Sequence, residues 1–144
     1  MKITGIRTQP FQTDMKRPIG DANNPVGRTT MTANALWIDT DDGVSGISMA
    51  GAPDPILQSL VDDILVGKDP RGVLGHWNNI IDYVFKGGNR GGATGAIAAL
   101  DIALWDLKAR INGEPLWKTL GASSNRVRAY ASGIDYPLSD QEIR

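Results

Sequence analysis

The chain has 144 residues, of which 41% are hydrophobic, 22% charged and 6% aromatic, a composition typical of one ordinary globular domain. Its 15 Lys and Arg residues against 16 Asp and Glu residues give a net charge of -1, which supplies no basic surface for nucleic acid, and no apolar run approaches the roughly 18 residues that a membrane span requires. The sequence contains no cysteine, which excludes disulfides, thiolate metal sites and cysteine nucleophiles, and these features together fit a cytoplasmic protein.

Strand-like alternation of apolar and polar side chains fills much of the first fifty residues. We predict a first strand over residues 2–11, a second over 32–40 and a third over 44–50. Asp41-Asp42-Gly43 joins the last two as a tight turn, because glycine takes a positive φ at low cost. The three strands are therefore expected to form an antiparallel meander.

A polar stretch over residues 12–30 separates the first two predicted strands. It is rich in residue types that disfavour both helix and strand, namely Pro18, Gly20, Asp21, Asn23, Asn24, Pro25 and Gly27. We predict a loop here. Loops of this length are unusual in compact domains, and those that are ordered often act as lids over binding sites.

Apolar residues at helical spacing follow residue 53. We predict one helix from Asp54 to Gly67, a second that opens at Asp69-Pro70, and a third over residues 94–111, with a short helical turn over 115–121. The third helix carries a stripe of large apolar residues and a second face of alanines, so we expect it to pack on two sides. Strands followed by helices indicate an α+β domain.

A second short strand-and-helix pattern closes the sequence. Residues 126–133 alternate like a strand, and Ser139 with Glu142 three residues later has the pattern of a helix-capping box. A strand followed by the first turn of a helix is half of a βα unit. We therefore predict one domain over residues 1–123 and the start of another over residues 124–144, with its remainder outside this sequence.

The stretch AIAALDIALWDLKARINGEPLWKTLGA, residues 96–122, resembles the signature of the mandelate racemase and muconate-lactonizing family of the enolase superfamily. The matching positions are Asp101, Ala103, Leu104, Asp106, Ala109, Arg110, Pro115, Leu116, Leu120 and Gly121. Thr119 and Ser123 depart from the residues usual at their positions. The opening strand, the hairpin around Gly43 and the segment Val66-Gly-Lys-Asp-Pro70 agree in order and spacing, so the resemblance covers nearly the whole chain.

The resemblance implies an enolase-like N-terminal capping domain, a three-stranded meander followed by a helical bundle, over a TIM-type barrel whose first strand is residues 126–133. It further implies that the catalytic Lys or His residues and three carboxylate ligands for Mg²⁺ lie on later barrel strands, so that this chain holds neither catalytic nor metal-binding residues. In that chemistry Mg²⁺ on the substrate carboxylate stabilises an enediolate while the base removes the neighbouring proton. The chain alone is then expected to be inactive.

Residues 16–28 resemble the specificity loop of the family, which folds over the mouth of the barrel. Arg17 and Arg28 are candidates for binding a substrate carboxylate through a bidentate fork, with Lys16 nearby. Asn23 and Asn24 are candidates for bonds to hydroxyl groups. The alternative for each is a solvated loop residue. Ser132, which the resemblance places at the carboxyl end of the first barrel strand, is a further candidate for substrate binding.

Other residues that suggest chemistry are interpreted as structural. Asp101 and Asp106 point about 140° apart on a helix, so they do not share a site, and Asp106 with Arg110 forms an ordinary i,i+4 pair. His76, the only histidine, lies in a segment that the family uses as scaffold. The glycine-rich stretch 86–95 joins two helices and lacks the Gly-Lys-Ser/Thr ending of a phosphate-binding loop.

The intact protein is thus expected to be a Mg²⁺-dependent enzyme that removes the α-proton of a small carboxylate, most simply an acid-sugar dehydratase, because the polar, basic loop suits a hydroxylated anion. A racemase, an epimerase, a cycloisomerase of the same family, and a stand-alone binding or assembly module remain as alternatives. We expect a homo-oligomer with no nucleic-acid or membrane partner.

Overall fold

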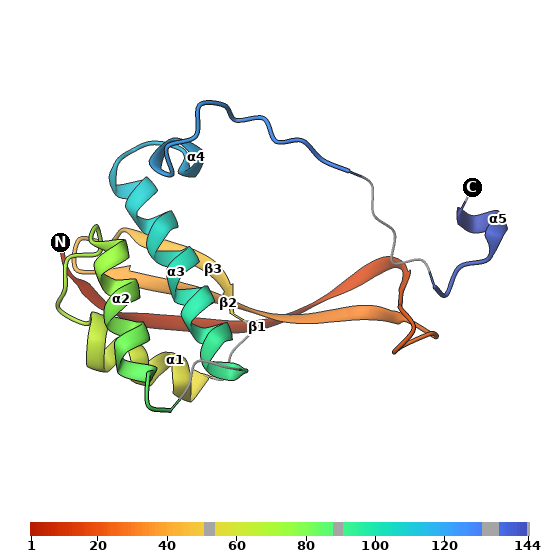
Figure 1. Ribbon diagram of the computed structural model, residues 1–144, viewed down its shortest axis with the longest axis horizontal. Helices are drawn as coiled ribbons and strands as arrows, with labels where there is room; N and C mark the ends of the chain where they lie inside the picture. The colour runs from red at the N-terminus through yellow and green to blue at the C-terminus, as the bar shows by residue number, and fades with distance from the viewer. Residues whose placement is uncertain (51–53, 88–90, 131–135, 144) are drawn as a thin grey trace. The chain divides into compact units, whose positions relative to one another are not determined.

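A computed structural model of the chain describes residues 1–50, 54–87, 91–130 and 136–143. The chain divides into two compact units. The first unit comprises Met1–Gln9 and Asn34–Asn125, and the second comprises Pro10–Ala33 and Arg126–Arg144. The order of elements, strands followed by helices, confirms the α+β class (Figure 1). In the described part of the chain, no helix is both long and apolar enough to cross a membrane.

The sheet has three strands in the order β1-β2-β3: β1 (Ile3–Ile19), β2 (Arg28–Thr40) and β3 (Ser45–Ala50). β2 and β3 pair antiparallel, with Trp37 opposite Ile47 and Asp39 opposite Ser45. Gly43 takes a φ of 83° in the turn between them, as its place in the tight turn predicted. The predicted antiparallel meander is confirmed.

The loop predicted over residues 12–30 is wrong at both ends. β1 continues through residues 12–19 and β2 begins at Arg28, so only residues 20–27 remain as a turn. We call residues Pro10–Ala33, the two strands with this turn, the arm. The strands pair through backbone hydrogen bonds, which need no apolar face, and threonines such as Thr13, Thr29 and Thr30 favour extended backbone. Pro18 is tolerated because β1 is an edge strand.

The helices of the first unit follow the predicted order. They are α1 (Asp54–Leu60), which a π-helical turn η1 (Val61–Leu65) continues, α2 (Val73–Val84), α3 (Gly92–Ile111) and α4 (Leu116–Thr119). The predicted helix from Asp54 to Gly67 therefore changes type at Val61. The side chain of Asp54 and residues 88–90 of the glycine-rich stretch lie outside the described parts.

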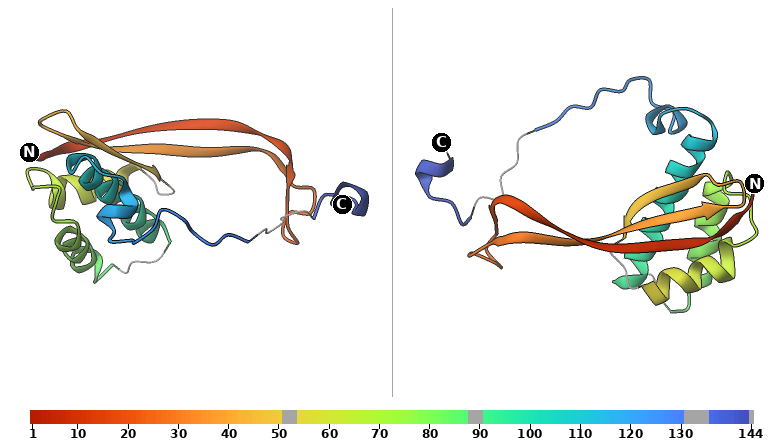
Figure 2. Two further views of the ribbon diagram at one scale, coloured as in Figure 1. Left: turned by 90° about the horizontal axis from the view of Figure 1, so that it is seen from above. Right: turned by 180° about the vertical axis from the view of Figure 1, so that it is seen from behind.

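α3 packs on two sides, as its two faces predicted (Figure 2). Its alanine face lies on β3: the Ser48 hydroxyl donates to the Ala99 carbonyl at 2.7 Å, and a Cβ added to Gly46 would lie 2.1 Å from the Ala103 carbonyl oxygen. The sheet contributes Leu36 and Ile38 to the core. The buried apolar residues of the helices complete it: Leu57, Leu60, Val61, Leu65, Val73, Ile80, Ile97, Leu100, Leu104 and Leu107.

In the second unit, α5 (Asp140–Ile143) begins with the reverse bond of the predicted capping box, in which Glu142 accepts the backbone N–H of Ser139. The Ser139 N–H and hydroxyl both donate to Glu142 Oε2, at 2.8 and 2.7 Å. The strand predicted over residues 126–133 is not formed in its described part: residues 126–130 are exposed and belong to no strand, and Ser132 with its neighbours lies outside the described residues. A strand needs a paired neighbour, and the sheet of the described chain ends with β1 and β3. The boundary after residue 123 stays a prediction.

Candidate functional site

The turn of the arm is fixed by its own hydrogen bonds. Asp21 Oδ1 accepts the backbone N–H groups of Asn23 and Asn24 at 2.9 and 3.0 Å, an arrangement typical of Asx turns. The Gly27 N–H donates to the Asn24 carbonyl at 3.0 Å. Because the Asp21 carboxylate already accepts backbone hydrogen bonds, the polar groups left to contact a ligand at the turn are the side chains of Asn23, Asn24 and Arg28.

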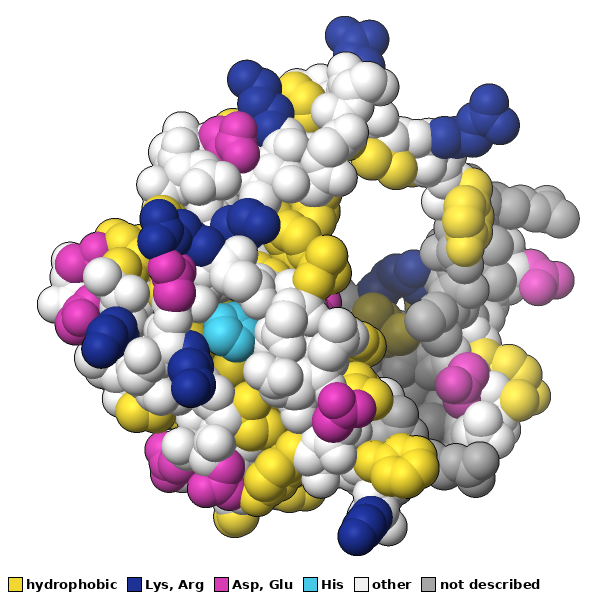
Figure 3. Space-filling view, turned by 60° about the vertical axis from the view of Figure 1, so that its left-hand side comes forward, with side chains coloured by type: hydrophobic (Ala, Val, Ile, Leu, Met, Phe, Trp, Pro, Cys, Tyr) yellow, Lys and Arg dark blue, Asp and Glu magenta, His cyan; other side chains and the backbone are white. Residues whose placement is uncertain are grey.

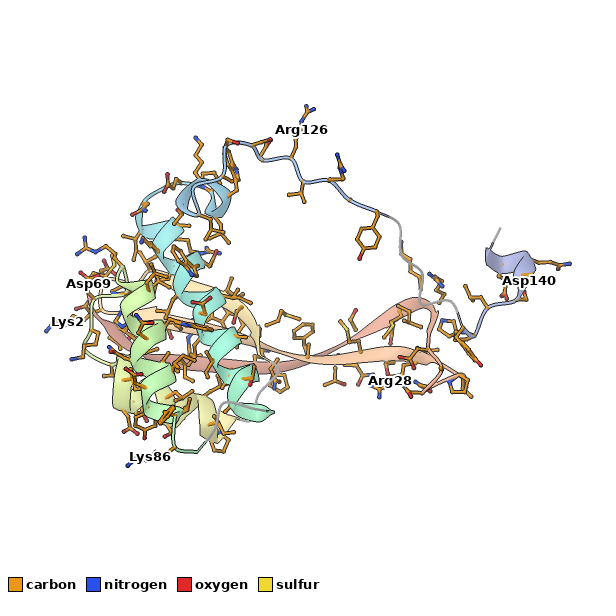
Figure 4. All side chains as sticks on the ribbon, in the orientation of Figure 1. Lys2, Arg28, Asp69, Lys86, Arg126 and Asp140 are labelled. Atoms are coloured by element: carbon orange, nitrogen blue, oxygen red, sulfur yellow. The ribbon has the colours of Figure 1, made fainter. Side chains whose placement is uncertain are left out.

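A cavity of about 320 Å³ lies at this turn, and its lining includes three of the residues predicted to bind substrate: Asn23, Asn24 and Arg28. Figure 4 labels Arg28 on the arm. Ile19, Gly20 and Asp21 complete its lining. The two amides offer hydrogen-bond donors and acceptors, and the guanidinium offers a planar cationic fork. This set is suited to a small anion that also carries hydroxyl groups.

A second cavity, of about 440 Å³, adjoins the first because Ile19 and Arg28 line both. Its other lining residues are Met15, Thr30, Met31 and Thr32. These four were missed in the sequence. Arg28, Thr30 and Thr32 are alternate residues of β2, but this stretch carries no alternation of apolar and polar residues that would have marked it as a strand in the sequence.

The remaining predicted residues do not join this site in the described structure. Arg17 and Lys16 are exposed on β1 and line neither cavity. Ser132 lies outside the described residues. The substrate-binding roles of all five residues named from the sequence therefore stay predictions, and geometry supports Asn23, Asn24 and Arg28 most directly.

A third cavity, of about 290 Å³, lies in the first unit beside Arg7, Trp37, Ser45 and Arg110. Its cations are already paired. The Arg7 guanidinium donates two hydrogen bonds to the Asp39 carboxylate, from Nε at 2.6 Å and from Nη2 at 2.9 Å. These bonds hold the pKa of the Asp39 carboxyl below its usual range. Arg110 Nε donates to Asp106 at 2.6 Å. Because these charges neutralise one another, this cavity is a weaker candidate for an anion than the one at the turn.

The two carboxylates of α3 have separate structural partners. Asp106 Oδ2 accepts a hydrogen bond from the backbone N–H of Ile47 at 2.9 Å and a second one from Arg110 Nε. The Asp106 carboxylate therefore satisfies a backbone donor of β3. Burial raises the pKa of Asp101, against a hydrogen bond from Trp105 that lowers it. Asp101 and Asp106 therefore do not form a carboxylate pair for acid–base chemistry.

His76 is buried, and its Nε2 lies 2.7 Å from the Asp69 carbonyl oxygen. The imidazole therefore ties the start of α2 to the segment before it. This contact agrees with the structural role assigned to it from the sequence.

Magnesium binds through several oxygen ligands in near-octahedral geometry. Within residues 1–50, 54–87, 91–130 and 136–143, no three His, Cys, Asp or Glu side chains converge in a way that could hold a metal ion. The described residues do not fit a magnesium site, and no chemical step is assigned to them through the ion. On the face drawn in Figure 3, acidic and basic side chains are interspersed with hydrophobic ones.

Comparison with known proteins identifies the family to which the chain belongs. Residues 4–121 match the family described as mandelate racemase / muconate lactonizing enzyme, N-terminal domain. A D-galactonate dehydratase family member from Marinomonas sp. (strain MWYL1) is 38% identical over 130 residues, which cover 82% of this chain and 30% of that protein. A D-galactarolactone cycloisomerase from Agrobacterium fabrum is 30% identical over 137 residues, which cover 92% and 36%.

Solved structures agree with the fold. A racemase from Streptomyces coelicolor A3(2) with bound magnesium matches with a TM-score of 0.79 and 28% identity, over 98% of this chain and 41% of that one. The chain spans about a third of the length of the curated relatives it matches. A D-mannonate dehydratase from Novosphingobium aromaticivorans is a further relative, 40% identical over 121 residues, which cover 76% of this chain and 28% of that protein.

Proposed function

The chain belongs to the mandelate racemase / muconate lactonizing enzyme family, as its N-terminal domain, and from this premise we propose that the intact protein is an acid-sugar dehydratase. The observation that carries the proposal is the cavity at the turn of the arm, which is lined by Arg28, Asn23 and Asn24. Dehydratases are among the relatives that match most of this chain.

In the proposed reaction the substrate loses the proton on the carbon beside its carboxylate together with the hydroxyl group on the next carbon, as water. The enol that results becomes a 2-keto-3-deoxy acid. The base and the magnesium ligands are assigned, in this proposal, to parts of the enzyme outside this chain. The capping domain contributes recognition, and the precise placement of substrate that it provides accelerates a reaction even when the lid itself transfers no proton.

The residues of the turn divide this recognition between charge and hydroxyl groups. Arg28 forms a bidentate pair with a carboxylate of the substrate, which a lysine would not reproduce. The amides of Asn23 and Asn24 exchange hydrogen bonds with the hydroxyls. The volume of the cavity, about 320 Å³, is at the lower end of the range for small-molecule sites, which suits a compact polar acid.

A racemase or cycloisomerase is the second candidate, favoured by the match to the Agrobacterium cycloisomerase and the Streptomyces racemase. These reactions share the removal of the α-proton but lose no water. The three outcomes are therefore distinguishable by product alone.

The proposal is tested by incubating the intact enzyme and Mg²⁺ with a panel of aldonic and aldaric acids. We expect one or a few of them to give a keto acid, detected as its semicarbazone, with the loss of one water by mass. The same reactions run in D₂O report racemisation as deuterium at the α-carbon. If no acid in the panel loses water, the dehydratase assignment is wrong, and if none exchanges its α-proton, the wider proposal is wrong as well.

The 144-residue chain itself is proposed to be inactive. Purified chain with Mg²⁺ and the best substrate of the intact enzyme should produce no keto acid above background. Turnover by the undegraded chain would contradict the assignment of base and metal ligands to other parts of the enzyme. We also place the intact enzyme in the cytoplasm, as a homo-oligomer.

A further inference from the structure

The segment before α5 meets the turn of the arm at Pro137. A Cβ added to Gly27 would lie 2.8 Å from Pro137 Cγ, and one added to Gly20 would lie 2.9 Å from the same atom. The proline ring therefore rests against two glycines that have no side chain to exclude it. Both segments belong to the second unit, and they lie side by side in Figures 1 and 2.

Both glycines are required by their surroundings. Gly27 has a φ of 78°, which favours glycine, and Gly20 approaches so closely that a Cβ would lie 2.4 Å from the Asn24 carbonyl oxygen. Gly20 is also buried, although most of its neighbours in the arm are exposed. The contact with Pro137 accounts for part of that burial.

The contact with Pro137 matters because the other hydrogen bonds of the turn, from Asn23, Asn24 and Gly27, join residues of the turn to one another. A two-stranded hairpin without a packed face is marginally stable in water. Of residues 10–33, all of which are described, only Gly20 is buried. The segment that carries Pro137 is better fixed than the turn, because the hydrogen bonds between Ser139 and Glu142 hold the chain two residues after Pro137. In addition, a proline ring loses little side-chain entropy when it is packed.

We propose that Pro137 is a positioning residue for the substrate site. Its ring, held between Gly20 and Gly27, fixes the turn that presents Asn23, Asn24 and Arg28 to the cavity. The role of the cavity in binding substrate rests on the proposed function, whereas the contact itself does not. Loosening the contact should weaken substrate binding more than it slows the chemical step.

The contact is tested in the 144-residue chain by disulfide trapping, because the sequence has no cysteine to interfere. The pair Gly27→Cys and Pro137→Cys should oxidise to an intramolecular disulfide, since the Cβ at position 27 falls beside the ring of Pro137 and a disulfide needs a Cβ separation of about 3.5–4.5 Å. The control pair is Thr13→Cys and Pro137→Cys. Thr13 lies seven residues before Gly20 on β1, about 23 Å along the strand.

A disulfide in the first pair and not in the second supports the contact. No disulfide in the first pair, or equal yields in both, overturns it. This readout does not depend on activity. A failure of the proposed function would leave the disulfide intact, so the two failures can be told apart.

The positioning role is tested in the intact enzyme by a double-mutant cycle. Gly27→Ala places a methyl group against Pro137 and should raise KM about tenfold with kcat within about twofold. Adding Pro137→Ala removes the Cγ that the methyl group meets, so KM should fall back to that of Pro137→Ala alone. Gly43→Ala is the matched control: its φ of 83° imposes a similar backbone strain, and its Cβ would meet no atom within 4 Å.

A KM that is raised in Pro137→Ala alone and raised further in Gly27→Ala, partly relieved in the double variant and unchanged in Gly43→Ala, supports the proposal. A KM for Pro137→Ala alone equal to that of the wild type overturns it. Equal effects of the two glycine substitutions overturn it, as does a KM in Gly27→Ala that Pro137→Ala leaves unchanged. A disulfide that forms while Gly27→Ala leaves KM unaltered also overturns the positioning role.

Discussion

The two units of the chain differ in what holds them together. The first has a continuous core, in which Leu100 on α3 and Leu36 on β2 are wholly shielded from solvent. The arm in the second has one buried residue, Gly20, and large apolar side chains such as Met31 remain 46% exposed. The polar groups suited to ligand binding lie where burial is least. Under the proposed function, stability and recognition are therefore divided between different parts of the chain.

The contrast is sharpest for truncation of a large apolar side chain. Leu100→Ala should lower the free energy of unfolding of the 144-residue chain by about 2–5 kcal/mol, because it leaves a cavity in the core. Met31→Ala in the arm should change it by less than about 0.5 kcal/mol, since that side chain is already half in water. Urea denaturation followed by circular dichroism measures both. Equal losses would contradict the division between the two units.

Overpacking gives the next effect in size. Gly46→Ala should destabilise the chain by about 1–3 kcal/mol, because its methyl group would meet the Ala103 carbonyl and the Leu107 backbone, which cannot move aside easily. Gly75→Ala on α2 is the control. Its Cβ would meet no atom within 4 Å, so the better helix propensity of alanine should stabilise the chain by about 0.5–1 kcal/mol. The same sign for both substitutions would show that α3 does not lie on β3 as described.

Asp106 links α3 to the edge of β3, and its removal should have a smaller effect. Asp106→Ala loses the bonds to Ile47 N–H and to Arg110, so we expect a loss of about 1–2 kcal/mol. Arg110→Ala breaks only the exposed ion pair and should lose less than about 1 kcal/mol. The difference between the two unfolding free energies isolates the strand-edge bond. If Arg110→Ala costs as much as Asp106→Ala, that bond contributes nothing.

The pH dependence of the first unit gives the smallest expected effect. Hydrogen bonding from Arg7 is the largest cause of the lowered pKa of Asp39 in the folded chain. A lowered carboxyl pKa contributes stability that is fully present above the unfolded value, about 3.9, and is lost as pH falls through the folded value. The stability gap between the wild type and Arg7→Gln should therefore narrow from pH 5 downward. A gap that is constant with pH would show that the Arg7–Asp39 pair does not contribute through titration.

The same contrast explains what the sequence could predict. In the first unit, helical spacing of Leu100, Leu104 and Leu107 reports burial directly, and these residues are buried. In the arm no face is buried, so residues 12–19 carry no period-2 pattern and were assigned to a loop although they form strand. Without burial on one face, the sequence of a strand lacks the alternation that identifies it.

The candidate site was only partly predictable for a related reason. Arg17 and Arg28 are equally basic in the sequence, yet only Arg28 lines the cavities, because its place just after the turn is set by the pairing of β1 with β2. The contact of Pro137 with Gly20 and Gly27 joins segments more than one hundred residues apart. No local pattern encodes such a contact.

Recognition of the substrate by the arm, with the stability of the chain residing in the first unit, is decided by kcat and KM of the intact enzyme carrying Arg28→Ala. We expect KM to rise at least about tenfold, because a charge-assisted bidentate pair is lost, while the unfolding free energy stays within about 0.5 kcal/mol of the wild type. Arg28→Lys should be intermediate, and Lys86→Ala, an exposed cation of the first unit, should leave KM unchanged. A KM for Arg28→Ala equal to that of the wild type would contradict the claim.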